Sequence, residues 1–265
     1  MPAEAGAGID IRLMGVAKRF GRGAGAVDAV APIDLTVEAG ETVALVGPSG
    51  CGKSTLLRIV AGLEAPDDGE VTLGGADPAA RRAEGALAVA FQDAALLPWR
   101  TLRGNVALAR RLARQAPDPA RVAHLIERVG LTGFESVRPG ALSGGMRQRA
   151  AIARCMATAP SVLLLDEPFG AVDELTRRRL NLELPPIWGE GGATVLLVTH
   201  SVREAVLIAD RVVVLSPRPA EIVAEIPVPL PRPRRAAMLE AGETRGISAR
   251  VEAALGDTAG ELAAE

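Results

Sequence analysis

The stretch Gly47-Pro48-Ser49-Gly50-Cys51-Gly52-Lys53-Ser54 decides the fold of this 265-residue chain. It follows a short apolar run at residues 43–46 and precedes residues 54–63, whose apolar side chains recur at helical spacing. A glycine-rich turn between a buried strand and a helix matches the phosphate-binding pattern G-x-x-x-x-G-K-[ST] in full. The sequence therefore predicts a P-loop nucleotide-binding fold.

Each residue type in this loop has a chemical reason. Glycines let successive backbone N–H groups point at phosphate oxygens, and the N-terminus of the following helix favours the same anion. We expect Lys53 to reach the β- and γ-phosphates and the Ser54 hydroxyl to ligate Mg²⁺. Lys18 is the only other lysine among 30 basic residues, which indicates that position 53 needs a compact ammonium group. We predict that the loop, continued to Thr55, binds ATP.

The composition is that of an ordinary globular protein. Apolar residues make up 48% of the chain and the formal net charge is -2, so there is no basic surplus and we expect no nucleic-acid partner. Apolar runs such as residues 195–198 are far shorter than the roughly 20 residues of a membrane-spanning helix. Residues 1–8 show no export signal, and the two cysteines suggest neither a metal site nor a disulfide framework. These features favour a protein of the reducing cytoplasm.

The order of patterns along the chain predicts an α/β core interrupted by helices. Strand-like patterns occur at residues 9–13, 33–37, 43–46, 71–73 and 86–91, and again at 162–165, 195–198 and 212–215. Residues 102–157 between the two groups have helical periodicity with arginine-rich polar faces. No internal repeat is present, so we expect one nucleotide-binding unit.

Two further motifs narrow the class. Leu142-Ser143-Gly144-Gly145-Met146-Arg147-Gln148-Arg149 resembles the signature L-S-G-G-Q-x-Q-R of ABC ATPases, and Val-Leu-Leu-Leu-Asp-Glu-Pro at residues 162–168 resembles their Walker B strand. Thr199-His200 follows in the order that this family has. The resemblance covers roughly residues 9–228 and implies a P-loop NTPase (RecA-like) core with an antiparallel β edge and an inserted helical subdomain. It divides the chain into an ATPase domain at 9–230, with core segments 9–92 and 160–228 and a helical subdomain at about 93–158, and a C-terminal tail at 231–265.

The signature suggests a second anion site. Ser143, Gly144 and Gly145 open a helix, where a hydroxyl and unpaired N–H groups favour phosphate, although the same residues could be a plain helix cap. In ABC ATPases this site binds the ATP that the other subunit's P-loop holds. The resemblance therefore implies a head-to-tail homodimer with two ATP molecules at its interface. Met146 departs from the family's glutamine but leaves Ser143 and the backbone donors in place.

The family also implies roles for residues at strand ends. Asp166 ends a buried apolar strand, where an unpaired carboxylate is costly, so hydrated Mg²⁺ is a natural partner. By resemblance, Glu167 is the general base for the attacking water, Gln92 contacts Mg²⁺ or that water, and His200 contacts the γ-phosphate. Asp173 resembles the family's interface residue in the segment called the D-loop.

Three other features are less specific. Phe20 is the only aromatic residue near enough upstream of the P-loop to stack on adenine, which is the favoured interpretation; the alternative is that it is simply a core residue. Residues 21–26 after it look like a small insertion. His124 lies among helical apolar residues and is expected to have an ordinary surface or packing role. Pro185-Pro186 is expected to break or kink the helix before Trp188.

The segments at residues 91–99, 215–219 and 229–234 resemble the subfamily that imports nitrate, sulfonates and taurine. Relatives of that subfamily import pyrimidine thiamin precursors or riboflavin, and this remains an alternative. The resemblance implies a peripheral subunit on the cytoplasmic face of the membrane, with permease partners and, indirectly, an external solute-binding protein. Leu97 and Trp99 could form a docking surface for the permease, unless Trp99 packs inside the helical insertion.

Two other functions fit part of the pattern. A soluble ABC ATPase without a permease would share all the motifs. Soluble members of the translation type carry two cassettes and those of the DNA-repair type carry long coiled-coil insertions, and this chain has neither. A P-loop kinase would lack the signature and His200. The arginines at positions 232, 234 and 235 could contact anionic lipid headgroups, but a solvated tail is the favoured interpretation.

Overall fold

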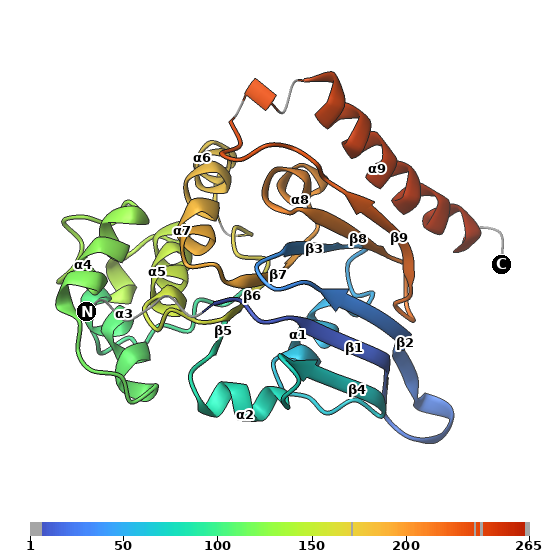
Figure 1. The fold of residues 1–265 in the computed structure, drawn as a ribbon, viewed down its shortest axis with the longest axis horizontal. Helices are drawn as coiled ribbons and strands as arrows, with labels where there is room; N and C mark the ends of the chain where they lie inside the picture. Colours follow the sequence, from blue (N-terminus) through green and yellow to red (C-terminus); the bar gives the residue numbers. More distant parts are fainter. Residues whose placement is uncertain (1–6, 171, 236, 239–240, 263–265) are drawn as a thin grey trace.

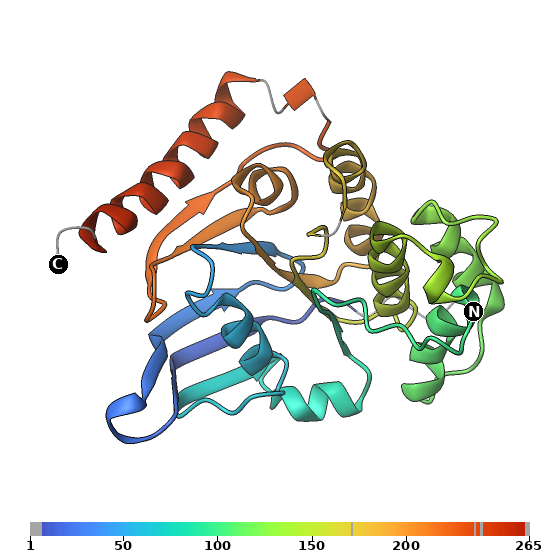
Figure 2. The ribbon, with the colours of Figure 1, turned by 180° about the vertical axis from the view of Figure 1, so that it is seen from behind.

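The strands of the protein form two sheets (Figures 1 and 2). The computed structural model describes residues 7–170, 172–235, 237–238 and 241–262. The strands within these ranges are β1 (Ile11–Phe20), β2 (Val27–Val37), β3 (Thr42–Val46), β4 (Asp68–Leu73), β5 (Leu87–Ala90), β6 (Val162–Asp166), β7 (Thr194–Thr199), β8 (Arg211–Leu215) and β9 (Ile222–Pro227). The large sheet has the order β5-β6-β7-β3-β8-β9 and the small one has the order β2-β1-β4.

The large sheet is parallel except at one edge. Strands β3, β6 and β7 are buried along their whole length and pair in parallel, while β9 joins the edge antiparallel to β8. Nearly continuous apolar strands are typical of parallel sheets covered on both faces. The small sheet is antiparallel throughout, and the short 3-10 helix η1 (Gly23–Gly25) lies in the connection from β1 to β2. The predicted α/β fold with an antiparallel edge is confirmed.

Two buried clusters cover the two faces of the large sheet. Helix α1 (Lys53–Val60) lies between the sheets, where Leu57 packs in one cluster with Leu45 and Leu13. The opposite cluster includes Leu165, Trp188 and the inner faces of the remaining long helices. Outside the helical subdomain, the other α-helices are α2 (Pro78–Ala83), α6 (Glu174–Glu183), α7 (Pro185–Glu190), α8 (Val202–Ile208) and α9 (Gly242–Leu262).

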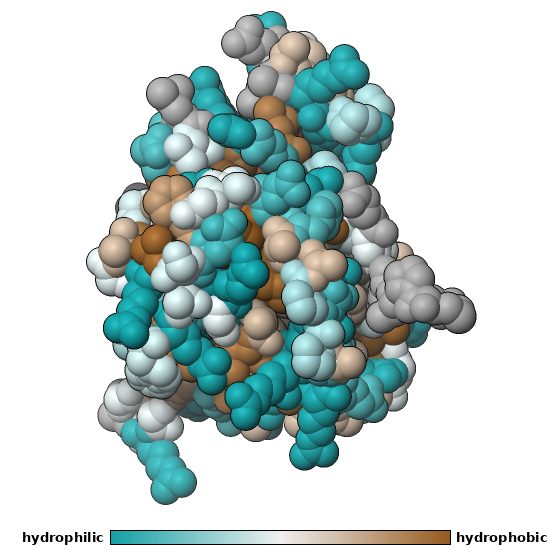
Figure 3. Space-filling model, turned by 90° about the vertical axis from the view of Figure 1, so that its left-hand side faces the viewer, coloured by the Kyte–Doolittle hydropathy of each residue, from teal (hydrophilic) through white to brown (hydrophobic). Residues whose placement is uncertain are grey.

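A helical subdomain interrupts the core between β5 and β6. It contains α3 (Leu102–Leu112), α4 (Pro119–Arg128), the 3-10 helix η2 (Pro139–Ala141) and α5 (Gly144–Met156). Thr101, Asp118 and Ser143 cap the three α-helices, each through a side-chain oxygen that accepts a backbone N–H. Figure 3 looks onto this side of the molecule, where polar side chains surround small hydrophobic patches. These helices lie between Leu102 and Met156.

The two prolines after α6 act as predicted. Helix α6 ends at Glu183, and Pro185 occupies the first turn of α7. Proline has no N–H to donate, but the first turn of a helix leaves such groups unpaired in any case. The two prolines therefore separate α6 from α7 without straining either helix. Trp188 of α7 is buried in the core.

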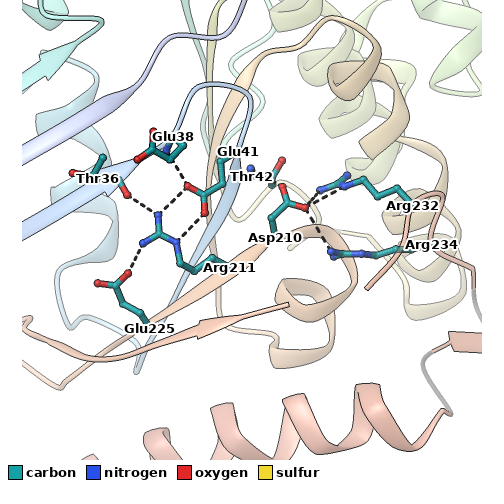
Figure 4. Close-up of polar contacts among 9 residues, drawn as sticks. All are labelled: Thr36, Glu38, Glu41, Thr42, Asp210, Arg211, Glu225, Arg232 and Arg234. Atoms are coloured by element: carbon teal, nitrogen blue, oxygen red, sulfur yellow. Dashed lines mark hydrogen bonds and ion pairs between the residues drawn. The ribbon is translucent and has the colours of Figure 1, made fainter. Parts of the chain in front are cut away.

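The arginine-rich segment after β9 is not a solvated tail. Figure 4 shows Asp210 facing both Arg232 and Arg234. The shortest distance from Arg232 to the Asp210 carboxylate is 2.8 Å. Arg234 is only 8% exposed and donates to the carbonyl oxygens of Val206 and Ala209 at the C-terminal end of α8. This burial lowers the pKa of Arg234 to about 10.

The segment that follows packs as well. Helix α9 lies along α8, β8 and β9 (Figures 1 and 2), and its own residues Ile247 and Val251 are buried against the core. A third arginine in Figure 4, Arg211, binds both carboxylate oxygens of Glu41 at 2.9 Å and also contacts Glu225 of β9. It donates to the carbonyl oxygen of Thr36 in β2, so it connects the small sheet to the large one.

Candidate nucleotide-binding and catalytic site

The phosphate-binding loop lies between the end of β3 and the start of α1. Gly50 and Gly52 have φ angles of 76° and 129°, in the left-handed region that favours glycine. A Cβ atom on Gly52 would lie 2.5 Å from the carbonyl oxygen of Ala29 in β2. Only glycine fits there, and the loop leads into the N-terminus of α1, where unpaired N–H groups favour an anion.

Lys53 lies inside this loop. Its side chain is buried, and Nζ donates hydrogen bonds to the carbonyl oxygens of Gly47 and Pro48 at 2.8 and 2.7 Å. These oxygens offset the cost of burying the charge. A phosphate group that enters the loop would compete with two carbonyl oxygens for an ammonium group already in position.

Asp166 and Ser54 meet beside the loop. Ser54 Oγ donates to Asp166 Oδ1 at 2.9 Å. Asp166 is almost fully buried at the end of β6, and this burial raises the pKa of its carboxyl group even though the Ser54 hydrogen bond lowers it. A nearby cation would favour the ionised form, and a hydroxyl beside a carboxylate suits Mg²⁺. The residues present therefore fit the predicted magnesium ion.

The three predicted catalytic residues come together at the carboxyl ends of adjacent strands. Glu167 Oε2 accepts a hydrogen bond from Gln92 Nε2 at 3.4 Å, and Glu167 Oε1 lies 3.5 Å from His200 Nδ1. Gln92 follows β5, Glu167 follows β6 and His200 follows β7, and these strands are neighbours in the sheet. The carboxylate of Glu167 is thus held between an amide and an imidazole.

The backbone of Glu167 adopts a conformation that side chains disfavour. Its φ angle is 46°, which costs on the order of 1–2 kcal/mol for a residue other than glycine. The N–H of Glu167 donates to Val198 of β7 at 2.9 Å, and its carbonyl oxygen accepts from Gly170 at 3.1 Å. A strained residue held in this way beside a predicted phosphate site supports a functional constraint on Glu167.

The signature lies at the start of α5. Ser143 Oγ accepts a hydrogen bond from the N–H of Met146 at 3.2 Å, and Gly144 and Gly145 form the first turn of the helix. A Cβ atom on Gly145 would lie 3.3 Å from Cγ2 of Val172, so the signature packs against the turn that precedes Asp173. Figures 1 and 2 show α5 in the helical subdomain, apart from α1.

Sequence reasoning missed two contacts of the site. Gln148 is buried in α5 and its Nε2 donates to the carbonyl oxygen of Gln92 at 3.3 Å, which connects the signature helix to a predicted catalytic residue. Arg218 donates two hydrogen bonds, of 3.1 and 2.6 Å, to the carbonyl oxygen of Gly50 in the phosphate loop. Gln148 belongs to the signature at residues 142–149 and Arg218 to the segment at residues 215–219, but neither pattern indicated these partners.

The remaining predicted residues lie at the edges of the site. Phe20 is 42% exposed at the end of β1, so it is not a core residue, and the ammonium of Lys18 lies 5.3 Å from its ring centroid. Stacking of Phe20 on adenine stays a prediction. Asp173 caps α6 by accepting a hydrogen bond from the N–H of Thr176 at 3.0 Å. His124 is exposed in α4, as expected.

Comparison with known proteins identifies the family. Residues 30–170 match the family described as ABC transporter. The chain belongs to the ABC transporter family of ATP-binding subunits. It is 45% identical over 92% of its length to the aliphatic sulfonates import ATP-binding protein SsuB 2 of Pseudomonas aeruginosa, covering 87% of that protein. It is 43% identical over 90% of its length to the nitrate import ATP-binding protein NrtD of Synechococcus elongatus, covering 88% of that protein. A taurine import ATP-binding protein, TauB of a Jannaschia species, is 44% identical over 77% of this chain, which covers 76% of TauB.

Solved structures agree with this assignment. The dimeric ATP-binding cassette MJ0796, in a post-hydrolysis state bound to ADP and Pi, has a TM-score of 0.73 and 30% identity to this ABC ATPase. The match covers 82% of this chain and 98% of the other. The ABC fold, the binding and hydrolysis of ATP, and the resemblance to nitrate, sulfonate and taurine import subunits are thereby confirmed. Within the described ranges, no helix has the length and apolar character needed to cross a membrane.

Proposed function

We propose that this ABC ATPase energises a membrane importer for a small solute of the nitrate, sulfonate or taurine type. The observation that carries the proposal is the Glu167 carboxylate, held between Gln92 and His200 beside the phosphate loop. The 43–45% identity to three import subunits for such solutes supports the solute class over the thiamin-precursor or riboflavin alternative.

The chemistry follows from the residues that surround the loop. The triphosphate of ATP binds the loop N–H groups, and Lys53 turns from its two carbonyl partners to the phosphates. Ser54 and Asp166, with Gln92 nearby, would hold Mg²⁺, which neutralises phosphate charge when bound. Glu167 accepts the proton of the attacking water, and His200 and Gln92 orient the carboxylate for this step.

The active site is completed by a second copy of the chain. The Ser143 hydroxyl and the N–H groups of Gly144 and Gly145 offer an anion site in the helical subdomain, whereas Lys53 belongs to the core. In a head-to-tail homodimer, each signature would cover the γ-phosphate held by the partner's phosphate loop. Asp173 lies in the turn next to the signature and would cross the same interface. The dimeric relative with ADP and Pi bound supports this arrangement.

An apolar groove offers a docking site for a permease helix. The groove has a volume of about 420 Å³ and is lined by Val89, Leu97, Leu108 and Leu112 among others. Trp99 is 67% exposed, so its interpretation as a packed residue of the subdomain is wrong. Trp99 does not line the groove, but it lies two residues after Leu97, which does. Exposed aromatic and aliphatic side chains of this kind anchor a helix of a partner protein.

Asn105 fixes the loop that carries this surface. Its Oδ1 accepts from the N–H of Leu97 at 2.7 Å, and its Nδ2 donates to the carbonyl oxygens of Leu97, Arg100 and Thr101. The side chain is fully buried. The loop is therefore held in one conformation before a partner binds, which lowers the entropic cost of docking.

Co-purification with the permease tests the docking surface. We expect the double substitution Leu97→Ala and Trp99→Ala to leave ATP binding intact and to lose association with the permease in mild detergent. Leu63→Ala is a matched control because Leu63 is also exposed and apolar but lies outside the groove. Retained association of the double variant would rule out this surface.

Isolation of the whole complex tests the function itself. The proposal expects this peripheral subunit on the cytoplasmic face of the membrane, bound to permease subunits, with an external solute-binding protein that selects the cargo. Mass spectrometry of that binding protein's ligand should find a nitrate-, sulfonate- or taurine-like solute. A chain that hydrolyses ATP but never co-purifies with a membrane protein would instead be a soluble ABC ATPase.

A further inference from the structure

A buried carboxyl group lies behind the catalytic residues. Glu204, in the first turn of α8, is only 4% exposed, and its Oε1 has no hydrogen-bond partner among the described residues. Burial raises the pKa of this carboxyl group to about 7. An unsatisfied buried acceptor and a desolvated charge both destabilise a fold. Glu204 therefore occupies this buried position at a cost in stability.

One contact of Glu204 leads to the end of β7. The N–H of Glu204 donates to the Ser201 hydroxyl at 3.3 Å, and the N–H of Ser201 donates to the Thr199 hydroxyl at 3.1 Å. The Thr199 hydroxyl in turn favours the ionised form of the Glu204 carboxyl group. Thr199 and Ser201 flank His200. Glu204 is therefore joined through Ser201 to the segment that carries the predicted γ-phosphate contact.

A second interaction leads to α6 and the turn before it. The positive charge of Arg177 favours the ionised form of Glu204, and both residues line a cavity of about 600 Å³ between α6, α8 and α9. Arg177 donates to the carbonyl oxygens of Phe169 and Val172 at 3.3 and 3.0 Å. These two carbonyls bracket the turn that connects Glu167 to Asp173.

Other charged groups face the same region from each packed element. Glu167 and Glu174 disfavour ionisation of Glu204. The arginines at positions 178, 203 and 245 and the carboxylate of Glu252 line the cavity from α6, α8 and α9. The net environment thus allows Glu204 to be ionised or protonated. Arg177, whose guanidinium also lies 3.6 Å from the Glu174 carboxylate, is the cation that favours the ionised form of Glu204.

We propose that Glu204 is a positioning residue of the ATPase site, linking the strand end that carries His200 to Arg177 and hence to the turn before Asp173. The inference rests on the γ-phosphate contact that the family resemblance implies for His200 and on the interface role proposed above for Asp173. In its ionised form, Glu204 attracts Arg177 and holds the two segments in fixed relation. Contact of His200 with one ATP would then be coupled to the segment predicted to cross the dimer interface.

The substitution Glu204→Gln in the full chain separates this role from a merely structural one. Glutamine keeps an acceptor for Thr199 and a similar volume but removes the charge. At about pH 8 we expect kcat to fall about five-fold with KM for ATP nearly unchanged, while the melting temperature stays equal or rises because a buried charge is lost. A structural residue would instead lower the melting temperature and leave kcat per folded molecule unchanged.

The pH profile gives a second readout. As the pH falls from about 8 to 6, Glu204 takes up a proton in the wild type and loses its attraction for Arg177. The ratio of wild-type to Glu204→Gln kcat should therefore approach one at the lower pH. Glu252→Gln, the same change of charge on the exposed rim of the cavity, should behave as wild type throughout.

A double-mutant cycle identifies the partner. If Glu204 acts through Arg177, then the double variant with Glu204→Gln and Arg177→Met should lose no more activity than either single variant. Wild-type kcat in Glu204→Gln at about pH 8, an undiminished deficit at pH 6, or multiplying losses in the double variant would overturn the inference. Glu167→Gln and His200→Ala serve as references: if both hydrolyse ATP normally, the proposed catalytic roles fail, whereas normal Glu204→Gln alone rejects only this inference.

Discussion

Nδ1 of His200 lies 3.5 Å from Oε1 of Glu167, although the two residues belong to different strand ends. The parallel register of β6 and β7 pairs Asp166 with Val198, and the N–H of Glu167 donates to Val198. The sheet itself therefore places the two residues side by side. Because the site lies at the surface, with the His200 side chain 53% exposed, a second subunit has room to approach the pair.

Lys53→Ala tests the charge inside the phosphate loop. The substitution removes the ammonium that now binds the carbonyl oxygens of Gly47 and Pro48, so we expect ATP affinity to fall at least about 100-fold. Titration calorimetry with ATP measures this directly. Unchanged affinity would exclude Lys53 from the site.

Arg218→Ala tests the support of the loop from outside. Two hydrogen bonds from the guanidinium hold the carbonyl oxygen of Gly50, and their net worth is about 1 kcal/mol at an exposed site. We expect ATP to bind about five-fold more weakly, with little change in melting temperature. Arg218→Lys should recover part of the affinity because one donor remains. If the alanine variant binds ATP as the wild type does, the loop does not depend on Arg218.

Arg234→Ala tests the anchoring of the C-terminal segment. Arg234 is buried and donates to Val206 and Ala209 at the end of α8 while facing Asp210. Removing it leaves acceptors and a carboxylate without this partner, so the free energy of unfolding should fall by about 3 kcal/mol. Denaturant titration measures the change. The exposed neighbour Arg235 is the control, and equal effects of the two substitutions would refute a specific anchor.

Local patterns predicted much of the fold and of the site. The strands β3, β6 and β7 and the glycine-rich loop could be predicted because buried strands and phosphate-binding loops each have a characteristic pattern within one short segment. The short helix α2 was missed since it has only six residues and no large apolar side chain, although Asp77 followed by Pro78 is a helix-start signal.

What the sequence could not predict are contacts between distant segments. Arginine usually lies in solvent, so Arg234 was interpreted as part of a solvated tail; only the carbonyl oxygens at the end of α8 explain its burial. The bond from Gln148 to Gln92 depends on how the helical subdomain packs against the core. The burial of Glu204 likewise arises from the packing of α6 and α9 around α8, which no single segment encodes.

The most direct test of the shared active site is the mass of Glu167→Gln in the presence of ATP. Without the general base, hydrolysis should fall by about 100-fold or more, so the ATP-bound state should persist. Light scattering should then show a dimer with ATP and a monomer without it. Adding Ser143→Arg to the same chain should abolish dimer formation, because the bulky cation fills the signature's anion site. A Glu167→Gln chain that binds ATP and stays monomeric would contradict the account.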